Sequence, residues 1–298
     1  GSRARTRPVN PADWLTDAEK RSRLARHPVE LGPCKRSAPS SRSRDLKCSL
    51  LGCASARRRI VESRITLRHE AAFGNSASLL AERLGFTASC YDMKAGCSSG
   101  VLALAQGALL VAAGCERVLV VMAENLSQLT PVEDLRALLT VGDGAACVLL
   151  EKSGGPGFVS VLHTTAPEFA SAFALRTPFP PGGPDARYVY EFSDTQAVPE
   201  FVHDRWRELI RDSLTSAGTP ASALSQAFLH QTHAAQIETL ASDLGFDPAR
   251  VPRVVQDHGN MGSPTFAVAM AASFASLAPG QRYLMAAVGG GVSSCAIV

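Results

Sequence analysis

The sequence lacks the features of membrane proteins, of secreted proteins and of proteins held together by structural zinc. No apolar run approaches the roughly 18 residues that a membrane-spanning helix needs, and the N-terminus has no signal-peptide pattern. The eight cysteines contain no CxxC pair, and a chain of 298 residues is too long for a small disulfide framework. We therefore expect a soluble, cytoplasmic protein with reduced thiols, no metal site and no membrane segment.

Signatures of nucleotide and zinc-protease chemistry are also missing. The glycines of VGDGAA at 141–146 do not have GxGxxG spacing, so we interpret this segment as a structural turn. His69-Glu70 is not followed by the second histidine of a zinc protease. Basic residues are not interleaved with aromatic ones, and no nucleic-acid motif occurs. These absences argue against a dinucleotide site, a catalytic metal and a nucleic-acid partner.

Charge is distributed unevenly along the chain. Residues 1–73 hold 17 of the 30 Lys and Arg residues but only 7 of the 27 Asp and Glu residues, whereas the remainder is net acidic. Such a basic segment could attract phosphate groups or an acidic carrier protein, or it could be a solvated arm. The sequence leaves its role open.

From residue 76 onward, strand and helix patterns alternate, which indicates an α/β fold. GGPG at 154–157 suggests a hinge between similar halves, 1–155 and 156–298, with a basic, divergent stretch at 1–60. An irregular insertion at 166–185 is a candidate lid or channel wall. Apolar periodicity predicts helices at 76–84, 199–214, 234–244 and 264–277, and strands at 88–91, 117–123, 227–229, 283–288 and 292–298. Residues 141–150 are predicted to form a turn followed by another buried strand. The run at 117–123 is typical of a strand buried on both faces.

Cys97 lies in AGCSSG, a turn that leads into an apolar helix. The free N–H groups and the dipole at the start of a helix favour a thiolate, as in an activated nucleophile. A free cysteine is also commonly a small buried hydrophobe, and position alone leaves both interpretations open. We interpret the other cysteines of this region as core residues: Cys90, Cys115, Cys147 and Cys295.

Three later segments could supply partners for Cys97. His230 follows a short strand, Asn260 lies in the glycine-bracketed loop HGNMG, and three glycines at 289–291 join two strands. Consecutive glycines let the backbone approach a ligand and expose its N–H groups. A cysteine, a histidine, an asparagine and backbone donors form a set for acyl transfer if they converge.

The order of these motifs resembles that of the thiolase-like condensing enzymes, and among them β-ketoacyl-ACP synthase III. The matching segments are AGCSSG, VGDGAA, LHQTH, DHGNMGSP and GGGV. The resemblance implies a five-layer αβαβα fold of two similar halves, usually in a homodimer. It implies that Cys97 is acylated and that His230 and Asn260 donate to a thioester carbonyl. The amides of Cys97 and Gly290 match the oxyanion hole, and Phe73 matches an aromatic residue that reaches into the partner's acyl pocket.

The resemblance also implies acyl-CoA or acyl-carrier-protein thioesters as substrates, with no cofactor. Asparagine at 260 favours decarboxylative condensation with a malonyl thioester, because an enolate needs hydrogen-bond donors, which a carboxylate would not supply. The first 40 residues, residues 187–198 and Thr232-His233 depart from the family's usual pattern, which favours polyketide or other specialised metabolism over fatty-acid initiation. Two alternatives stay open: acyl transfer to an alcohol or amine without decarboxylation, and a non-catalytic carrier-binding relative.

Overall fold

The computed structural model describes residues 29–32, 58–63, 76–128, 130, 135–154, 157–170, 173–176, 189–192, 197–290 and 293–298. The strands are β1 (Val29–Gly32), β2 (Arg58–Ser63), β3 (Ser89–Met93), β4 (Arg117–Asn125), β5 (Asp143–Lys152), β6 (Val161–Thr165), β7 (Phe173–Arg176), β8 (Val189–Phe192), β9 (Gln226–Leu229), β10 (Tyr283–Gly289) and β11 (Ser293–Ile297). The helices are α2 (Ser76–Leu84), α3 (Ser99–Ala112), α4 (Leu135–Leu138), α5 (Ala197–Ser216), α6 (Ala234–Leu244), α7 (Val255–His258) and α8 (Thr265–Ala272). Short 3-10 turns cover Leu126–Gln128, Pro167–Phe169, Ala221–Ala223, Pro248–Arg250 and Phe274–Ser276.

The first half forms a mixed sheet in the order β1-β5-β4-β2-β3. β4 runs parallel to β2 and β2 parallel to β3, whereas β5 is antiparallel to both of its neighbours. Alternate residues of β4 are fully buried, and the residues between them are only half-buried. The prediction of a strand buried on both faces is therefore only partly right, because the helix α2 covers the second face incompletely.

The second half repeats this arrangement in the sheet β6-β11-β10-β9. β9 and β10 are parallel, and β11 runs antiparallel to β10 and to β6. This pattern matches that of β1, β5, β4 and β2, so the two halves share one plan, as the sequence predicted. The chain leaves the first sheet at Lys152 and enters the second at Val161.

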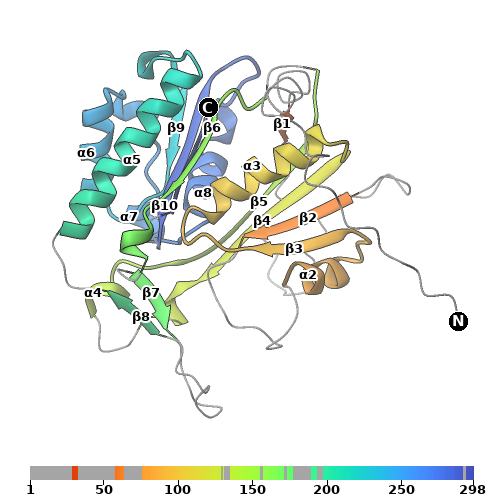
Figure 1. The fold of residues 1–298 in the computed structure, drawn as a ribbon, viewed down its shortest axis with the longest axis horizontal. Coiled ribbons are helices and arrows are strands. Elements are labelled where there is room, and N and C mark those ends of the chain that lie inside the picture. The colour runs from red at the N-terminus through yellow and green to blue at the C-terminus, as the bar shows by residue number, and fades with distance from the viewer. Residues whose placement is uncertain are drawn as a thin grey trace, which may run out of the picture.

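Helices form three layers around the two sheets (Figure 1). α2 contacts β2 and β3 on one outer face, and α5 and α6 cover the opposite outer face. α3 and α8 lie in the middle, where each contacts strands of both sheets. The predicted α/β fold with five αβαβα layers is confirmed.

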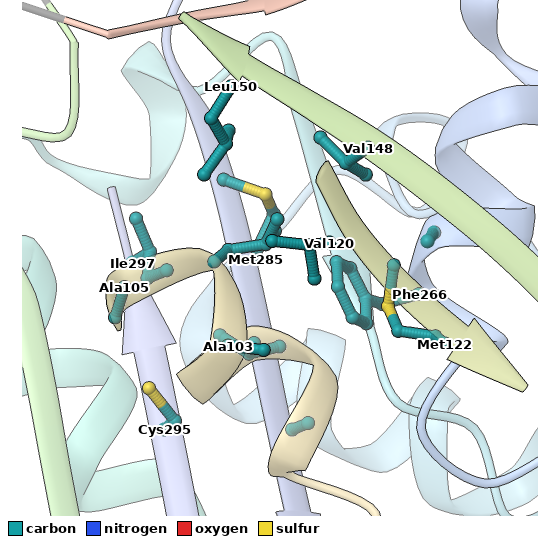
Figure 2. Packing of buried hydrophobic residues seen from close by; sticks show 14 of the residues in the cluster. Ala103, Ala105, Val120, Met122, Val148, Leu150, Phe266, Met285, Cys295 and Ile297 are labelled. Atoms are coloured by element: carbon teal, nitrogen blue, oxygen red, sulfur yellow. The ribbon is translucent and has the colours of Figure 1, made fainter. Parts of the chain in front are cut away.

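The helix α3 fits between the sheets because many of its side chains are small. Figure 2 shows Ala103 and Ala105 between side chains of β11 and side chains of β4. Gly107 has no room for a side chain, since an added Cβ would lie 2.6 Å from Leu150 Cδ1. The apolar helix that follows Cys97 thus lies in the middle layer of the molecule, between the two sheets.

Three expectations are wrong in detail. The insertion at 166–185 is not wholly irregular, because β7 pairs with β8 in a two-stranded antiparallel sheet. α8 ends at Ala272 and a 3-10 turn follows, since the apolar pattern continues into a partly exposed segment that includes Phe274. Cys147 is exposed rather than in the core, because it lies on the face of β5 opposite to the buried Val148.

Candidate active site

Cys97 lies in the tight turn between β3 and α3. Gly96 adopts a positive φ of 57°, and its carbonyl accepts hydrogen bonds from the Ser99 N–H at 3.0 Å and the Ser99 hydroxyl at 2.7 Å. Ser98 is the N-cap of α3, so Cys97 precedes the helix by two residues. The thiol-bearing residue is 8% exposed. The turn therefore presents Cys97 at the buried start of the central helix.

The glycines at the end of β10 lie directly against this turn. A Cβ added to Gly289 would come 2.2 Å from the Cys97 nitrogen, and one added to Gly96 would come 2.5 Å from the Gly290 nitrogen. Only glycine permits backbones to approach this closely. As a result, the N–H groups of Cys97 and Gly290 lie beside the Cys97 thiol, and both lower its pKa.

The Cys97 thiol is protonated at neutral pH. Burial raises its pKa to about 12, the charge of Glu124 raises it as well, and the N–H groups of Cys97 and Gly290 lower it. The backbone donors thus favour a thiolate, as predicted for this turn, but loss of solvation outweighs them in the resting protein. The thiol must lose its proton when it reacts.

His230 follows the end of β9, and its backbone N–H donates to Ala286 of β10 at 2.8 Å. The residue is 1% exposed. Burial lowers the pKa of the imidazole to about 4, although a hydrogen bond with the Gly262 backbone raises it. Among the described residues, the ring nitrogen Nδ1 has no hydrogen-bond partner. The ring is therefore neutral at pH 7, with one nitrogen unengaged.

Asn260 is held through its backbone and its side chain. Its N–H donates to the Thr140 carbonyl at 2.7 Å, and its carbonyl accepts from the Gly142 N–H at 2.9 Å. Its side-chain Oδ1 accepts from the Gly262 N–H at 2.9 Å, which leaves the amide NH2 as the end that can donate to another group. A Cβ on Gly142 would lie 1.8 Å from the His258 carbonyl oxygen, so the VGDG segment packs directly against the loop that contains Asn260.

The segment Gly262–Ser263 lies beside two of the candidates. The Gly262 N–H donates to Asn260 Oδ1 at 2.9 Å, and the Gly262 backbone raises the pKa of the His230 ring. The Ser263 carbonyl lies against the first turn of α3, where a Cβ on Gly100 would come within 2.7 Å of it. The segment therefore adjoins Asn260 and His230 and packs against the helix that follows Cys97.

Glu124 is a residue of this site that the sequence reasoning missed. It lies near the end of β4, is 4% exposed, and accepts a hydrogen bond from the Ser263 hydroxyl at 2.6 Å. A signal for it exists in the sequence: alternate positions of RVLVVMAEN place it on the same strand face as Val118, Val120 and Met122. A carboxylate on an otherwise apolar, buried face points to a specific partner.

A series of hydrogen-bonded side chains holds Ser98, the residue after Cys97. The hydroxyls of Ser98 and Ser293 lie 3.0 Å apart, and the Ser293 hydroxyl lies 2.9 Å from His163 Nε2. Ser98 also donates to the Ala95 carbonyl at 2.6 Å. The turn of Cys97 is therefore tied to β11 and β6 of the second sheet.

Other predicted features lie apart from this cluster or outside the described residues. Phe73 and most of the basic stretch at 1–60 lie outside them. His233 is exposed and caps α6, where it accepts from the Gln236 N–H at 3.1 Å. In the part of the chain that the structure describes, no group of acidic, histidine and cysteine side chains is arranged to hold a metal ion. Its helices are also too short or too polar to cross a membrane.

Comparisons with known proteins point to one family. Models of 3-oxoacyl-[acyl-carrier-protein] synthase III and of its C-terminal part match residues 91–166 and 214–298. A β-ketoacyl-[acyl-carrier-protein] synthase III of Streptomyces coelicolor is 31% identical over 233 residues, which are 75% of this chain and 68% of that protein. The acetoacetyl CoA synthase NphT7 of a Streptomyces species is 30% identical over 232 residues, 74% of this chain and 70% of that protein.

A solved structure has the same fold. The priming β-ketosynthase of the R1128 polyketide biosynthetic pathway superposes with a TM-score of 0.74 at 23% identity, over 81% of this chain and 74% of that one. The fold and the site together define a thiolase-fold condensing enzyme. Within that class, the chain belongs to the 3-oxoacyl-[acyl-carrier-protein] synthase III family.

Proposed function

We propose that this condensing enzyme takes an acyl group from a CoA or carrier-protein thioester onto Cys97 and joins it to a malonyl thioester with loss of CO2. One observation carries the proposal: the buried Cys97 thiol has the backbone N–H groups of Cys97 and Gly290 beside it, and Ser263, next to the segment that holds Asn260, packs against the helix that follows Cys97. Together with His230, these groups are the donors that both half-reactions need.

In the first half-reaction, the Cys97 sulfur attacks the carbonyl carbon of the acyl thioester. A new C–S bond forms, the bond to the departing thiol breaks, and the proton of Cys97 ends on that thiol. The negative charge on the tetrahedral intermediate is held by the N–H groups of Cys97 and Gly290. Each such donor typically lowers the barrier by about 3 kcal/mol. Because the resting thiol has a pKa of about 12, proton loss accompanies the attack.

In the second half-reaction, the bond between the malonyl carboxylate and the α-carbon breaks, and CO2 leaves. The electron pair becomes an enolate on the thioester oxygen, where His230 and the Asn260 amide donate hydrogen bonds. The α-carbon then attacks the acyl carbonyl, the bond between the acyl carbon and sulfur breaks, and Cys97 leaves as a thiolate that takes up one proton from water. Burial keeps the His230 pKa at about 4, so the ring is neutral at physiological pH and has a single N–H, which must point to the enolate oxygen in this step.

Two finer assignments belong to the same proposal. We place the enzyme in specialised metabolism, which its divergent N-terminal stretch and its likeness to a polyketide-priming ketosynthase support. We also propose a homodimer: among the described strands β3 forms one edge of the first sheet, opposite to β1, and an open sheet edge favours pairing with a second copy. Light scattering after size-exclusion chromatography measures that state directly.

The experiment that tests the proposal uses a panel of acyl-CoA and acyl-carrier thioesters. Intact-mass spectrometry first identifies the donor that leaves an acyl group on the protein. Carboxyl-labelled malonyl thioester is then added, and both labelled CO2 and a β-ketoacyl product are expected. Turnover without CO2 would instead show acyl transfer to an alcohol or amine. A carrier-binding protein without catalysis would give neither adduct nor CO2.

A further inference from the structure

A buried carboxylate stands beside the proposed catalytic residues with no role in either half-reaction. Glu124 is 4% exposed and continues the row of Val118, Val120 and Met122 that faces α3. Placing a charge in such an environment is unfavourable unless specific hydrogen bonds compensate it. The position therefore calls for a function that an apolar residue would not supply.

The Ser263 hydroxyl donates to Glu124 Oε1 at 2.6 Å, and both groups are buried. This length is typical of a charge-assisted O–H···O⁻ bond, which is stronger than a bond between neutral groups. The bond joins the end of β4 to a residue 139 positions later. It therefore anchors the Gly262–Ser263 segment to the first sheet.

The anchored segment orients Asn260, one of the two proposed donors of the decarboxylation step. The Gly262 N–H holds the oxygen of the Asn260 amide at 2.9 Å, so the NH2 end is turned to donate. A shift of Gly262 would therefore displace this amide, while the two N–H groups at Cys97 belong to a different stretch of backbone.

We propose that Glu124, as a carboxylate, is a positioning residue for decarboxylation: its hydrogen bond from Ser263 fixes the Gly262–Ser263 backbone, which in turn aims the Asn260 amide. The inference rests on the proposed function of Asn260 as a donor to the enolate. It assigns Glu124 no contact with substrate. It predicts that the two half-reactions respond differently when the anchor is removed.

The test compares three variants with the wild type. Glu124→Ala removes both the charge and the acceptor, Glu124→Gln keeps an acceptor for Ser263 without the charge, and Ser263→Ala removes the donor. For each, intact mass gives the extent of Cys97 acylation, and labelled CO2 gives decarboxylation per acylated enzyme. Thermal unfolding checks that each variant is folded.

Glu124→Ala and Ser263→Ala should lower CO2 release about 100-fold, as expected for misaligned reacting groups, while acylation of Cys97 stays near the wild-type extent. Glu124→Gln should recover most of the loss. Equal losses in both half-reactions would overturn the proposal, because they indicate a general structural role. It is overturned equally if Ser263→Ala has no effect or if Glu124→Gln is as poor as Glu124→Ala.

A further readout needs no substrate. Because a carboxylate opposes the ionisation of Cys97, Glu124→Gln should shift the pH dependence of Cys97 alkylation by iodoacetamide toward lower pH, measured by peptide mapping. No shift would contradict an ionised Glu124. This result stands even if no acyl donor is found, so failure of the inference can be told apart from failure of the proposed function.

Discussion

Cys97 and Cys295 are two buried cysteines with the same ionisation behaviour and very different surroundings. They are 8% and 0% exposed, and burial raises the pKa of each thiol to about 12. Cys295 lies in the middle of β11, paired with Ala287 and His163 and packed beside α3 in the central apolar cluster (Figure 2). Cys97 lies where a strand ends, a helix begins and two glycines close in.

Burial and a raised pKa are common to both cysteines, so these properties do not identify the nucleophile. What distinguishes Cys97 is the backbone of a second segment, since the Gly290 N–H reaches its sulfur from the far end of β10. Cys295 has only the N–H of the next residue, Ala296. A reacting thioester oxygen needs two converging donors, and among these two sites only the Cys97 turn provides them.

The largest effect on Cys97 is expected when the space beside it is filled by a side chain. Gly289→Ala would place a Cβ 2.2 Å from the Cys97 nitrogen, so the backbone must move. We expect acylation of Cys97 to slow by about 100- to 1,000-fold, the loss typical for one oxyanion donor. Rapid-quench intact mass measures it.

Gly154→Ala is the matched control, because an added Cβ there meets no atom within 4 Å. Its acylation rate should equal that of the wild type. A Gly289→Ala enzyme that acylates normally would show that the close backbone approach has no catalytic role.

The next prediction separates Cys97 from its partner donors. Asn260→Asp keeps the shape of the side chain but replaces the NH2 donor with a carboxylate oxygen. We expect decarboxylation to fall about 100-fold, while acylation of Cys97 is retained, as measured by labelled CO2 and intact mass. Loss of acylation to the same degree would place Asn260 in the first half-reaction instead.

A pH measurement tests whether the site is kept neutral by burial. The folded-state pKa of His230, about 4, lies below its ordinary value of 6.5. The unfolded chain therefore binds the proton first as pH falls, and stability that is fully present above pH 6.5 is lost toward pH 4. Between about pH 7 and pH 4.5, the wild type should lose roughly 2–3 kcal/mol more unfolding free energy than His230→Gln.

Urea unfolding of both proteins at the two pH values measures this difference. If both lose the same free energy, the His230 ring is solvated and not held neutral.

The smallest effect is expected at the cysteines outside the site. Cys295→Ala leaves a small cavity in the core and should reduce the unfolding free energy by about 1 kcal/mol, without changing turnover. The exposed Cys147→Ala should change it by less than about 0.5 kcal/mol. Denaturant melts and a turnover assay check both; a large activity loss in Cys295→Ala would undo the contrast with Cys97.

Local sequence signals predicted much of the fold. The helices at 76–84 and 234–244 have the predicted bounds, because Gly85 and Gly245 take the positive φ that ends each helix. The order of the motifs predicted the thiolase-like layers. The pairing of β7 with β8 was not predicted, since register between separated segments leaves no local pattern.

The candidate residues of the site were predicted from the sequence, but their burial and the hydrogen bonds around them were not. Cys97, His230 and Asn260 stood out by residue type and neighbouring glycines, whereas the pKa of the thiol depends on burial by both halves of the molecule. Glu124 was missed because its meaning comes from Ser263, which lies far away in sequence. Contacts between distant segments cause both the desolvation of the Cys97 thiol and the anchoring of Ser263 by Glu124. No single stretch of sequence contains the information for such contacts.

The most direct test of this account is to map the acyl adduct in wild type, Cys97→Ala and Cys295→Ala with the same acyl thioester donor. Intact mass and peptide mapping should show one adduct on Cys97 in the wild type, none in Cys97→Ala, and an unchanged adduct in Cys295→Ala. An adduct that survives Cys97→Ala, or disappears in a folded Cys295→Ala, would contradict the claim that Cys97 alone takes the acyl group.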